Sequence, residues 1–488
     1  MIEETIKIHD NFSLELKVGF IGNVHQPNNQ FKVNTWFFVP NSLDINPSTY
    51  SKEQFYHDLR SNIRLITPIY TLQEIAEGTD SPIVAIEKAI KDLLEGNGKA
   101  PLKELEYQFK MFNSILKSSL REDEALIIQN YPSETGVKLI ELYVEFVQII
   151  STKFRLLEAA LAQPKVSSQA HDFFLFSDEF MSVLIENHSF KLLHTLEQTF
   201  KVKKDDLPVL KLLQQIKEEL KYKKKKGYLM VERDSADKNR SVILRRSVLK
   251  KYSESELFLN TEKKEDAFLI RQFVYSLAAG LSMIFATIVA FSFQMKYGSF
   301  TMPVFAALVV GYMLKDRIKE LSRFYFAHKL GNKYFDLKTT ISIGNDTLGI
   351  CKESFDIIKN EKIPIEVMME RNRSALLEAD NKFNQEQIML YRMQVETNNN
   401  LLNEHNEYPV AGINNIIRLN LNSFLEKMDN PEVPLYHMGV GGNTYHYVKG
   451  EKVYFINMVL HLQHETQSEY KRYRIVFNRD GIKDVEKY

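Results

Sequence analysis

The residues best suited to bind a metal are four histidines near the end of the chain, His437, His446, His461 and His464. Imidazole nitrogens ligate zinc and iron, so such a set could form a metal site. His461 and His464 are three positions apart in a segment that is typical of a β-strand, which puts them on opposite faces of a sheet. His437 and His446 could meet across a hairpin. We expect packing or surface histidines, and no metal or other cofactor.

Two glycine-rich segments invite comparison with phosphate-binding loops. Gly96-Asn97-Gly98-Lys99 lacks the GxxxxGK[ST] spacing and follows a helix-like segment instead of a strand. Gly439-Val440-Gly441-Gly442-Asn443 does not match GxGxxG, and no helical pattern follows it. We interpret both as turns, with a ligand-contacting loop as the alternative for the second.

Sequence motifs of the common enzyme classes are missing from the chain. It contains no GxSxG, HExxH, kinase or Walker motif. Acid–base pairs can also be assembled from residues far apart in the sequence. The sequence therefore favours a non-enzymatic protein and leaves a membrane-tethered enzyme as an alternative.

A basic segment from Lys217 to Lys251 holds 13 Lys or Arg residues against five Asp or Glu residues. Anionic lipids attract basic residues near a membrane surface by about 1 kcal/mol each. The alternatives are a solvated helix end or, because interleaved aromatic residues are sparse, more remotely a nucleotide or nucleic acid. The candidate lipid-contact residues are Lys221, Lys223, Lys224, Lys225, Lys226, Arg245, Arg246, Lys250 and Lys251.

Two uncharged runs would bring this basic segment to a membrane. The first has 24 residues between Arg271 and Lys296, and the second has 18 residues from Tyr297 to Leu314. At about 1.5 Å per residue, each is in the range that crosses a hydrocarbon core of about 30 Å. We expect a two-helix transmembrane hairpin between Gln272 and Leu314. A buried hairpin of a soluble protein and a re-entrant second segment are the alternatives.

Basic residues on both sides of this hairpin predict its orientation. The turn between the runs contains only Lys296, so the positive-inside rule places both termini in the cytosol. We expect an integral protein of a bacterial inner membrane with two spans. The flanking basic residues are Lys263, Lys264 and Arg271 before the first run, and Lys315, Arg317, Lys319 and Arg323 after the second.

Small residues recur at helical spacing in both runs and favour close helix packing. This packing could occur within the hairpin or between copies of the chain, and we expect a homo-oligomer. No ionisable residue lies inside either run, which argues against a pump or coupled transporter. The candidate packing residues are Ser276, Gly280, Ser282, Ala286, Ala290, Ala307 and Gly311.

The turn between the runs gives one resemblance to a known family. Tyr297-Gly298, followed by a short turn and a second run, resembles the CorA-type divalent-cation channels, which carry YGMN where this chain reads YGSF. The resemblance covers the hairpin alone, and those channels end soon after their second span whereas this chain continues. It implies a ligand-gated channel or membrane-perturbing effector as an alternative function. The altered motif removes the usual basis of a cation-selective mouth.

Composition and periodicity predict an α+β protein on both sides of the hairpin. The chain has 488 residues, 63 basic and 63 acidic residues and a single cysteine, so it contains no intrachain disulfide. Alternation predicts strands over 12–20 and 31–39, which suggest an antiparallel pair, and over 454–462. A helix is expected from Ile365 to about Glu404. The predicted regions are a β-containing domain 1–75, a helical domain 81–260, the hairpin 272–314, a helical segment 315–405 and a β-rich domain 406–488.

These features together predict a membrane-anchored binding, sensor or scaffold protein. Its partners would be membrane lipid, further copies of itself, and a protein or small ligand bound by cytosolic lobes on either side of the hairpin. The balanced charge of the whole chain gives no reason to expect nucleic acid.

Overall fold

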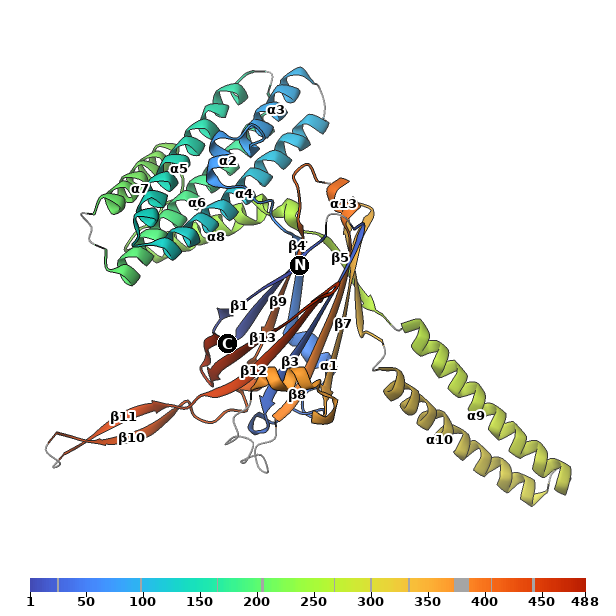
Figure 1. The fold of residues 1–488 in the computed structure, drawn as a ribbon. Helices are drawn as coiled ribbons and strands as arrows, with labels where there is room; N and C mark the ends of the chain where they lie inside the picture. The colour runs from blue at the N-terminus through green and yellow to red at the C-terminus, as the bar shows by residue number, and fades with distance from the viewer. Residues whose placement is uncertain are drawn as a thin grey trace. The chain divides into compact units, whose positions relative to one another are not determined.

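In the computed structural model, the chain forms two compact units, the sheet unit and the helical unit (Figure 1). The sheet unit comprises residues 1–64, 259–407 and 412–488, and the helical unit comprises residues 65–258 and 408–411. The predicted mixture of helices and strands is confirmed. The structure describes residues 1–23, 26–96, 99–164, 166–202, 206–266, 268–298, 301–331, 334–372, 386–404, 406–440 and 444–488.

Two antiparallel sheets and a separate two-stranded ribbon form the sheet unit. The larger sheet has the strand order β14 (Gly481–Lys487), β13 (Gln467–Asn478), β12 (Tyr454–His464), β3 (Asn28–Pro40), β8 (Glu386–Asn398), β7 (Asp346–Ile358), β6 (Leu337–Ile343) and β5 (Asn260–Glu265). The smaller sheet has the order β1 (Ile2–Asp10), β2 (Ser13–Ile21), β9 (Gly412–Asn420) and β4 (Leu59–Leu65). The ribbon pairs β10 (Glu432–Met438) with β11 (Tyr445–Glu451).

Strands from the two ends of the chain share both sheets. β3 lies between β12 and β8, and β2 pairs with β9. The prediction of one β domain at each end is therefore wrong. The three predicted strands are present, but 12–20 and 31–39 lie in different sheets and do not form a pair.

The continuous helix predicted from Ile365 to Glu404 is also wrong. The helical assignment of 315–405 holds as far as Gly331, the end of α10, and is wrong for the segments that form β6, β7 and β8. Among the described residues of 365–404, which exclude 373–385, only α11 (Ile365–Arg371) and α13 (Asn399–Glu404) are helical, and β8 is a strand. Met389, Tyr391, Met393 and Val395 are buried at every second position of β8. This period of two matches a strand that packs one face on a core.

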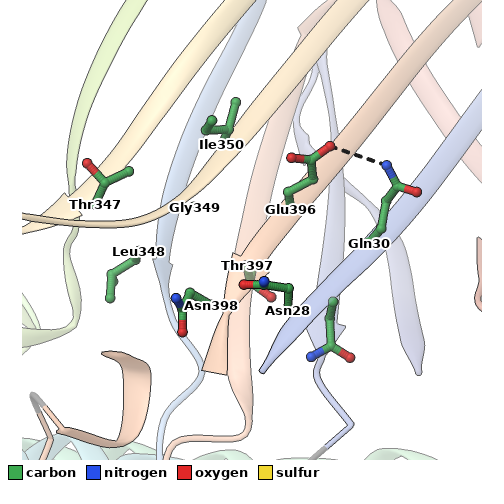
Figure 2. Close-up of a pocket in the computed structure, with 10 residues that line it drawn as sticks. Asn28, Gln30, Thr347, Leu348, Gly349, Ile350, Glu396, Thr397 and Asn398 are labelled. Atoms are coloured by element: carbon green, nitrogen blue, oxygen red, sulfur yellow. Dashed lines mark hydrogen bonds between the residues drawn. The ribbon is translucent and has the colours of Figure 1, made fainter. Parts of the chain in front are cut away.

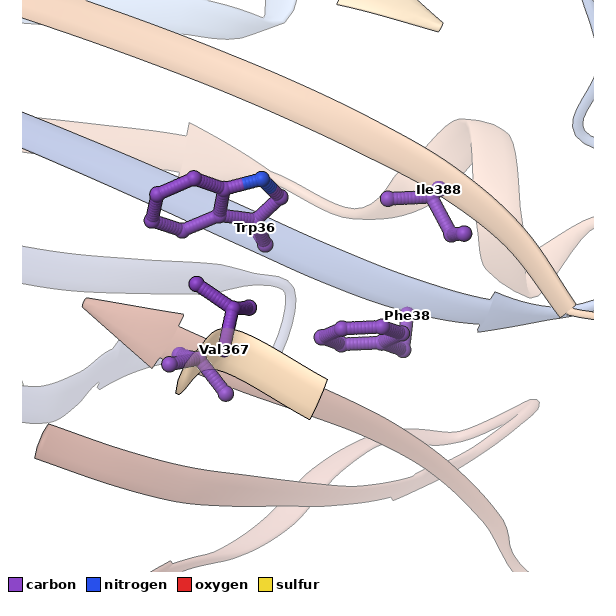
Figure 3. Packing of buried hydrophobic residues seen from close by; sticks show 5 residues of the cluster. Trp36, Phe38, Val367 and Ile388 are labelled. Atoms are coloured by element: carbon purple, nitrogen blue, oxygen red, sulfur yellow. The ribbon is translucent and has the colours of Figure 1, made fainter. Parts of the chain in front are cut away.

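Both faces of the larger sheet are covered by short helices. On one face Trp36, Phe38, Ile388 and Val459 form a cluster on which Val367 of α11 packs (Figure 3). On the other, Phe55 of α1 (Lys52–Asp58) stacks on Phe355 with ring centroids 3.8 Å apart. The remaining short elements of this unit are α14 (Asn422–Leu425) and the 3-10 turns η1 (Asn41–Leu43) and η3 (Asn360–Lys362).

The helical unit consists mainly of long helices, as the sequence predicts for 81–260. Serine side chains cap several of them, for example Ser133 and Ser167, which accept hydrogen bonds from Gly136 N and Ala170 N. The elements are α2 (Leu72–Glu77), α3 (Pro82–Glu95), α4 (Lys99–Asn130), α5 (Glu134–Leu161), α6 (Ser168–Phe200), α7 (Leu207–Lys226), α8 (Ala236–Ser253) and η2 (Ser255–Leu257).

The predicted hairpin region forms two long helices, α9 (Phe268–Tyr297) and α10 (Met302–Gly331), which pack side by side (Figure 1). They are inserted between β5 and β6, which are paired neighbours at one edge of the larger sheet. Among the described residues, one helical segment, Gln272–Tyr297, is long and apolar enough to cross a membrane. α10 does not meet that criterion, so the second predicted span is not confirmed.

Candidate functional site

The first candidate surface is the apolar exterior of α9. Only 11% of the most apolar stretch of this helix is buried within the structure. Exposed side chains include Ile284, Ile288 and Phe291, which are 57%, 59% and 61% exposed. Contact between such a surface and water is unfavourable, and a continuous apolar surface of this kind marks a contact with lipid or protein.

The small residues predicted to pack helices divide into two groups. Ser282 and Ala307 are buried, and a Cβ on Gly311 would lie 3.6 Å from Val289 Cγ1, so these residues allow close contact between α9 and α10. Ala286 and Ala290 are half-buried. Ser276 and Gly280 are exposed on the outside of α9, and a Cβ on Gly280 would meet nothing within 4 Å.

The basic segment lies on α7 and α8 of the helical unit, and four of its nine candidate residues pair with carboxylates there. Lys223 is fully buried against Glu186. Such a side chain cannot reach a lipid headgroup, so the lipid-contact prediction is wrong for Lys223. The other three pairs are Lys226 with Glu158 at 2.6 Å, Arg245 with Glu179 at 3.0 Å and Arg246 with Glu186 at 3.0 Å. Lys221, Lys224, Lys225, Lys250 and Lys251 are exposed.

Besides these pairs, the helical unit contains a further network of buried charges. Asp178 is fully buried and accepts hydrogen bonds from the Tyr222 and Tyr228 hydroxyls at 2.8 and 2.6 Å. Burial, together with the Asp178 carboxylate, raises the pKa of both tyrosines above its ordinary value. Arg155 donates to Asp178 at 3.3 Å and to Glu219 at 2.6 Å. Part of the basic segment therefore neutralises carboxylates inside the helical unit.

A cleft lies where β3, β8 and β7 run side by side, and it has a volume of about 390 Å³ (Figure 2). Across it Gln30 Nε2 donates to Glu396 Oε1 at 3.2 Å. Gly349 lies opposite Thr397, and a Cβ there would come within 2.2 Å of Glu396 O, so only glycine permits this strand spacing. The lining residues are Asn28, Asn29, Gln30, Thr347, Leu348, Gly349, Ile350, Glu396, Thr397 and Asn398.

The chemistry of the cleft is that of hydrogen bonding. Its polar groups are amides, hydroxyls and a single carboxylate, beside the apolar side chains of Leu348 and Ile350, and its lining includes no histidine, cysteine or lysine. Such a set can hold an uncharged polar group, but it lacks a nucleophile paired with a base. Sequence reasoning missed this cleft because it is assembled from three segments that are far apart in the chain.

The ribbon β10–β11 is the second candidate surface. From Val433 to Val448 the sequence contains no Asp, Glu, Lys or Arg. Tyr436 and Tyr445 are 72% and 71% exposed, and their ring centroids lie 6.1 Å apart on one face. Among the described strands, none pairs with the outer edge of β10 or β11. An isolated two-stranded ribbon is marginal in water, so this apolar surface is suited to a protein contact.

The four candidate histidines do not converge. His437 and His446 face each other across the ribbon, as predicted. His461 and His464 lie in β12, where odd spacing places them on opposite faces of the sheet. His461 stacks on Tyr470 and His464 on Phe31, with ring centroids 4.1 and 4.4 Å apart. Burial lowers the pKa of both imidazoles.

A metal site receives no support from the described residues. In that part of the chain, no group of three or more His, Cys, Asp or Glu side chains is arranged to hold a metal ion. Residues 97–98 and 441–443 of the two glycine-rich segments lie outside the described residues.

Comparison with known proteins adds no family to this picture: no family model, curated protein or solved structure matches the chain.

Proposed function

We propose that this chain is a membrane-attached, non-enzymatic scaffold protein that α9 and α10 hold on a membrane. The observation that carries the proposal is the apolar exterior of α9, which no described part of the chain covers. Transfer of such side chains from water to hydrocarbon contributes about 25 cal/mol per Å² of apolar surface. Even the partial exposure of Ile284, Ile288 and Phe291 thus supplies several kcal/mol for attachment.

The proposed topology has both ends of the hairpin on one side of a bacterial inner membrane. α9 follows β5 and α10 precedes β6, and these two strands are paired. The bases of the two helices, meaning their ends next to β5 and β6, therefore start from one sheet edge. The basic residues Lys315, Arg317 and Lys319 follow the apolar part of α10. The positive-inside rule assigns that side to the cytosol.

Self-association is the second part of the proposal, and the ribbon β10–β11 is its contact surface. Between Val433 and Val448 the ribbon has no charged residue, and its tyrosine, methionine and valine side chains give it the composition of a protein interface. This part lacks the cations that anionic lipid or nucleic acid would require. The outer edges of both strands can add a strand from another copy. Attachment of all copies to one membrane raises their effective concentration.

Flotation with lipid vesicles tests the attachment. The full chain should float with vesicles, and Ile284→Glu/Ile288→Glu should abolish flotation, because two charges on exposed positions of α9 oppose entry into hydrocarbon. The matched control is Ile243→Glu/Leu244→Glu, which places the same charges on two residues of α8 that are 67% and 66% exposed. Flotation of the α9 variant at the level of the unchanged chain would refute membrane attachment through this hairpin.

A further inference from the structure

When α9 and α10 are compared side by side, the apolar part of α9 extends further from the turn between them than the apolar part of α10 does. The antiparallel register is fixed by two contacts: Gly311 lies against Val289, with 3.6 Å to Cγ1 from a Cβ at the glycine, and the Arg323 guanidinium lies 5.2 Å from the Tyr275 ring centroid. Because both helices rise about 1.5 Å per residue, positions 315–323 of α10 lie level with positions of about 284–276 of α9.

The base of α10 is charged at the level where α9 is still apolar. Asp316, Arg317 and Glu320 have side chains that are 71%, 78% and 70% exposed. Beside them α9 exposes Leu277 and Leu281. If the apolar run of α9 were centred in a bilayer of ordinary thickness, these exposed charges of α10 would lie within hydrocarbon, which is strongly unfavourable.

Over one stretch of the hairpin, α9 and α10 are both apolar. A lysine and a tyrosine lie at each end of this stretch. At the tip, Lys296 lies 5.5 Å from the Tyr297 ring centroid, and toward the base Lys315 lies 4.4 Å from the Tyr312 ring centroid. Tyrosine and lysine concentrate at membrane–water interfaces. The intervening stretch of α10, Met302 to Leu314, has a length of about 20 Å.

We infer that the hairpin crosses a bilayer whose hydrocarbon core is about 20 Å thick at that point, thinner than the usual core of about 30 Å. The partner is a lipid bilayer that is thin or that thins locally around the hairpin. This inference rests on the proposed membrane attachment and adds the class of membrane that the hairpin selects. The two Lys–Tyr pairs would lie in the headgroup layers on opposite sides.

Flotation of the full chain with phosphatidylcholine vesicles of three chain lengths tests the inference. The lipids are dimyristoleoyl, dioleoyl and dierucoyl phosphatidylcholine, which form thin, ordinary and thick bilayers. The chain should associate best with the thin bilayer, and about tenfold or more weakly with the thick one, because each ångström of mismatch adds to the cost of insertion.

Two variants of α10 make the test specific. Lys315→Leu/Asp316→Leu/Arg317→Leu extends the apolar part by about one helical turn and should move the preference toward the ordinary bilayer. The matched variant Lys315→Ser/Asp316→Ser/Arg317→Ser removes the same charges without extending it and should keep the preference for the thin bilayer. Fluorescence of Trp36, the single tryptophan, verifies that both variants are folded.

The possible outcomes distinguish the preference for a thin bilayer from membrane attachment itself. Best association of the unchanged chain with the ordinary bilayer, or equal association with all three, would overturn the 20 Å thickness while leaving membrane attachment in place. Absence of flotation with every vesicle would refute attachment itself.

Discussion

At the scale of single residues, burial separates the lysines that serve the fold from those that face solvent. Lys223 and Lys224 are adjacent in a run of four lysines, yet Lys223 is fully buried and Lys224 is exposed. Glu186, which neutralises Lys223, lies on a different helix. The sequence shows the basic run but not this difference, because the burial of Lys223 depends on how α6 and α7 pack.

Lys223→Met tests this assignment. Among the described residues, Arg246 is then the cation that remains paired with buried Glu186, and we expect the free energy of unfolding of the helical unit to fall by about 3 kcal/mol. The control Lys224→Met should change it by less than about 0.5 kcal/mol. The helical circular dichroism signal during denaturation measures both. Equal stabilities of the two variants would contradict the buried ion pair.

His461 gives the larger sheet a dependence on pH. Burial lowers the pKa of this imidazole in the folded state, while Glu366 on α11 opposes the shift. The unfolded chain therefore binds a proton more readily, and stability that is present above about pH 6.5 is lost as the pH falls below it.

His461→Phe should weaken this pH dependence while keeping an aromatic ring beside Tyr470. We expect the thermal midpoint, followed by Trp36 fluorescence, to fall less between about pH 7.5 and about pH 5.5 in the variant than in the unchanged chain. Trp36 suits the measurement because its ring centroid lies 6.4 Å from that of His461. His57→Phe, at a side chain that is 82% exposed, is the control. A full pH dependence in His461→Phe would assign the effect to other groups.

At the scale of elements, periodicity predicts some strands and misses others. The alternation over 31–39 and 454–462 predicts β3 and β12, and the opposite orientation of His461 and His464 follows from it. The same period in Met389, Tyr391, Met393 and Val395 identifies β8, but the glutamines and glutamates around it are also good helix formers. There the packing of one face on the core outweighs helix propensity.

The proposed role of the ribbon β10–β11 as a contact between copies of the chain can be tested by substitution. Tyr436→Ser/Tyr447→Ser removes two rings from one face, whose centroids lie 6.2 Å apart. If the ribbon joins copies of the chain, the mass of the particle in detergent, measured by light scattering, should fall toward that of a monomer. Phe190→Ser/Leu229→Ser, at two exposed apolar positions of the helical unit, is the control. An unchanged mass in the ribbon variant would remove the ribbon as the contact surface.

At the scale of the whole molecule, the helical unit and the hairpin interrupt the succession of strands along the chain. The chain leaves the sheet unit after β4, builds the helical unit, returns at β5, and adds α9 and α10 before β6. Composition and hydropathy predict the α+β class, the helical region and the apolar hairpin. They do not predict that strands from both ends pair, because such long-range pairing depends on the complementarity of whole faces and not on local pattern.

We propose that α9 and α10 hold this molecule on a membrane, and alkaline carbonate extraction of membranes from cells that express the chain measures this attachment. Carbonate strips proteins that are bound only by charge and leaves those whose apolar surface is in hydrocarbon. We predict that the unchanged chain stays with the membrane pellet, whereas Ile284→Glu/Ile288→Glu is released. Complete release of the unchanged chain into the supernatant would show that α9 and α10 do not hold it in the membrane.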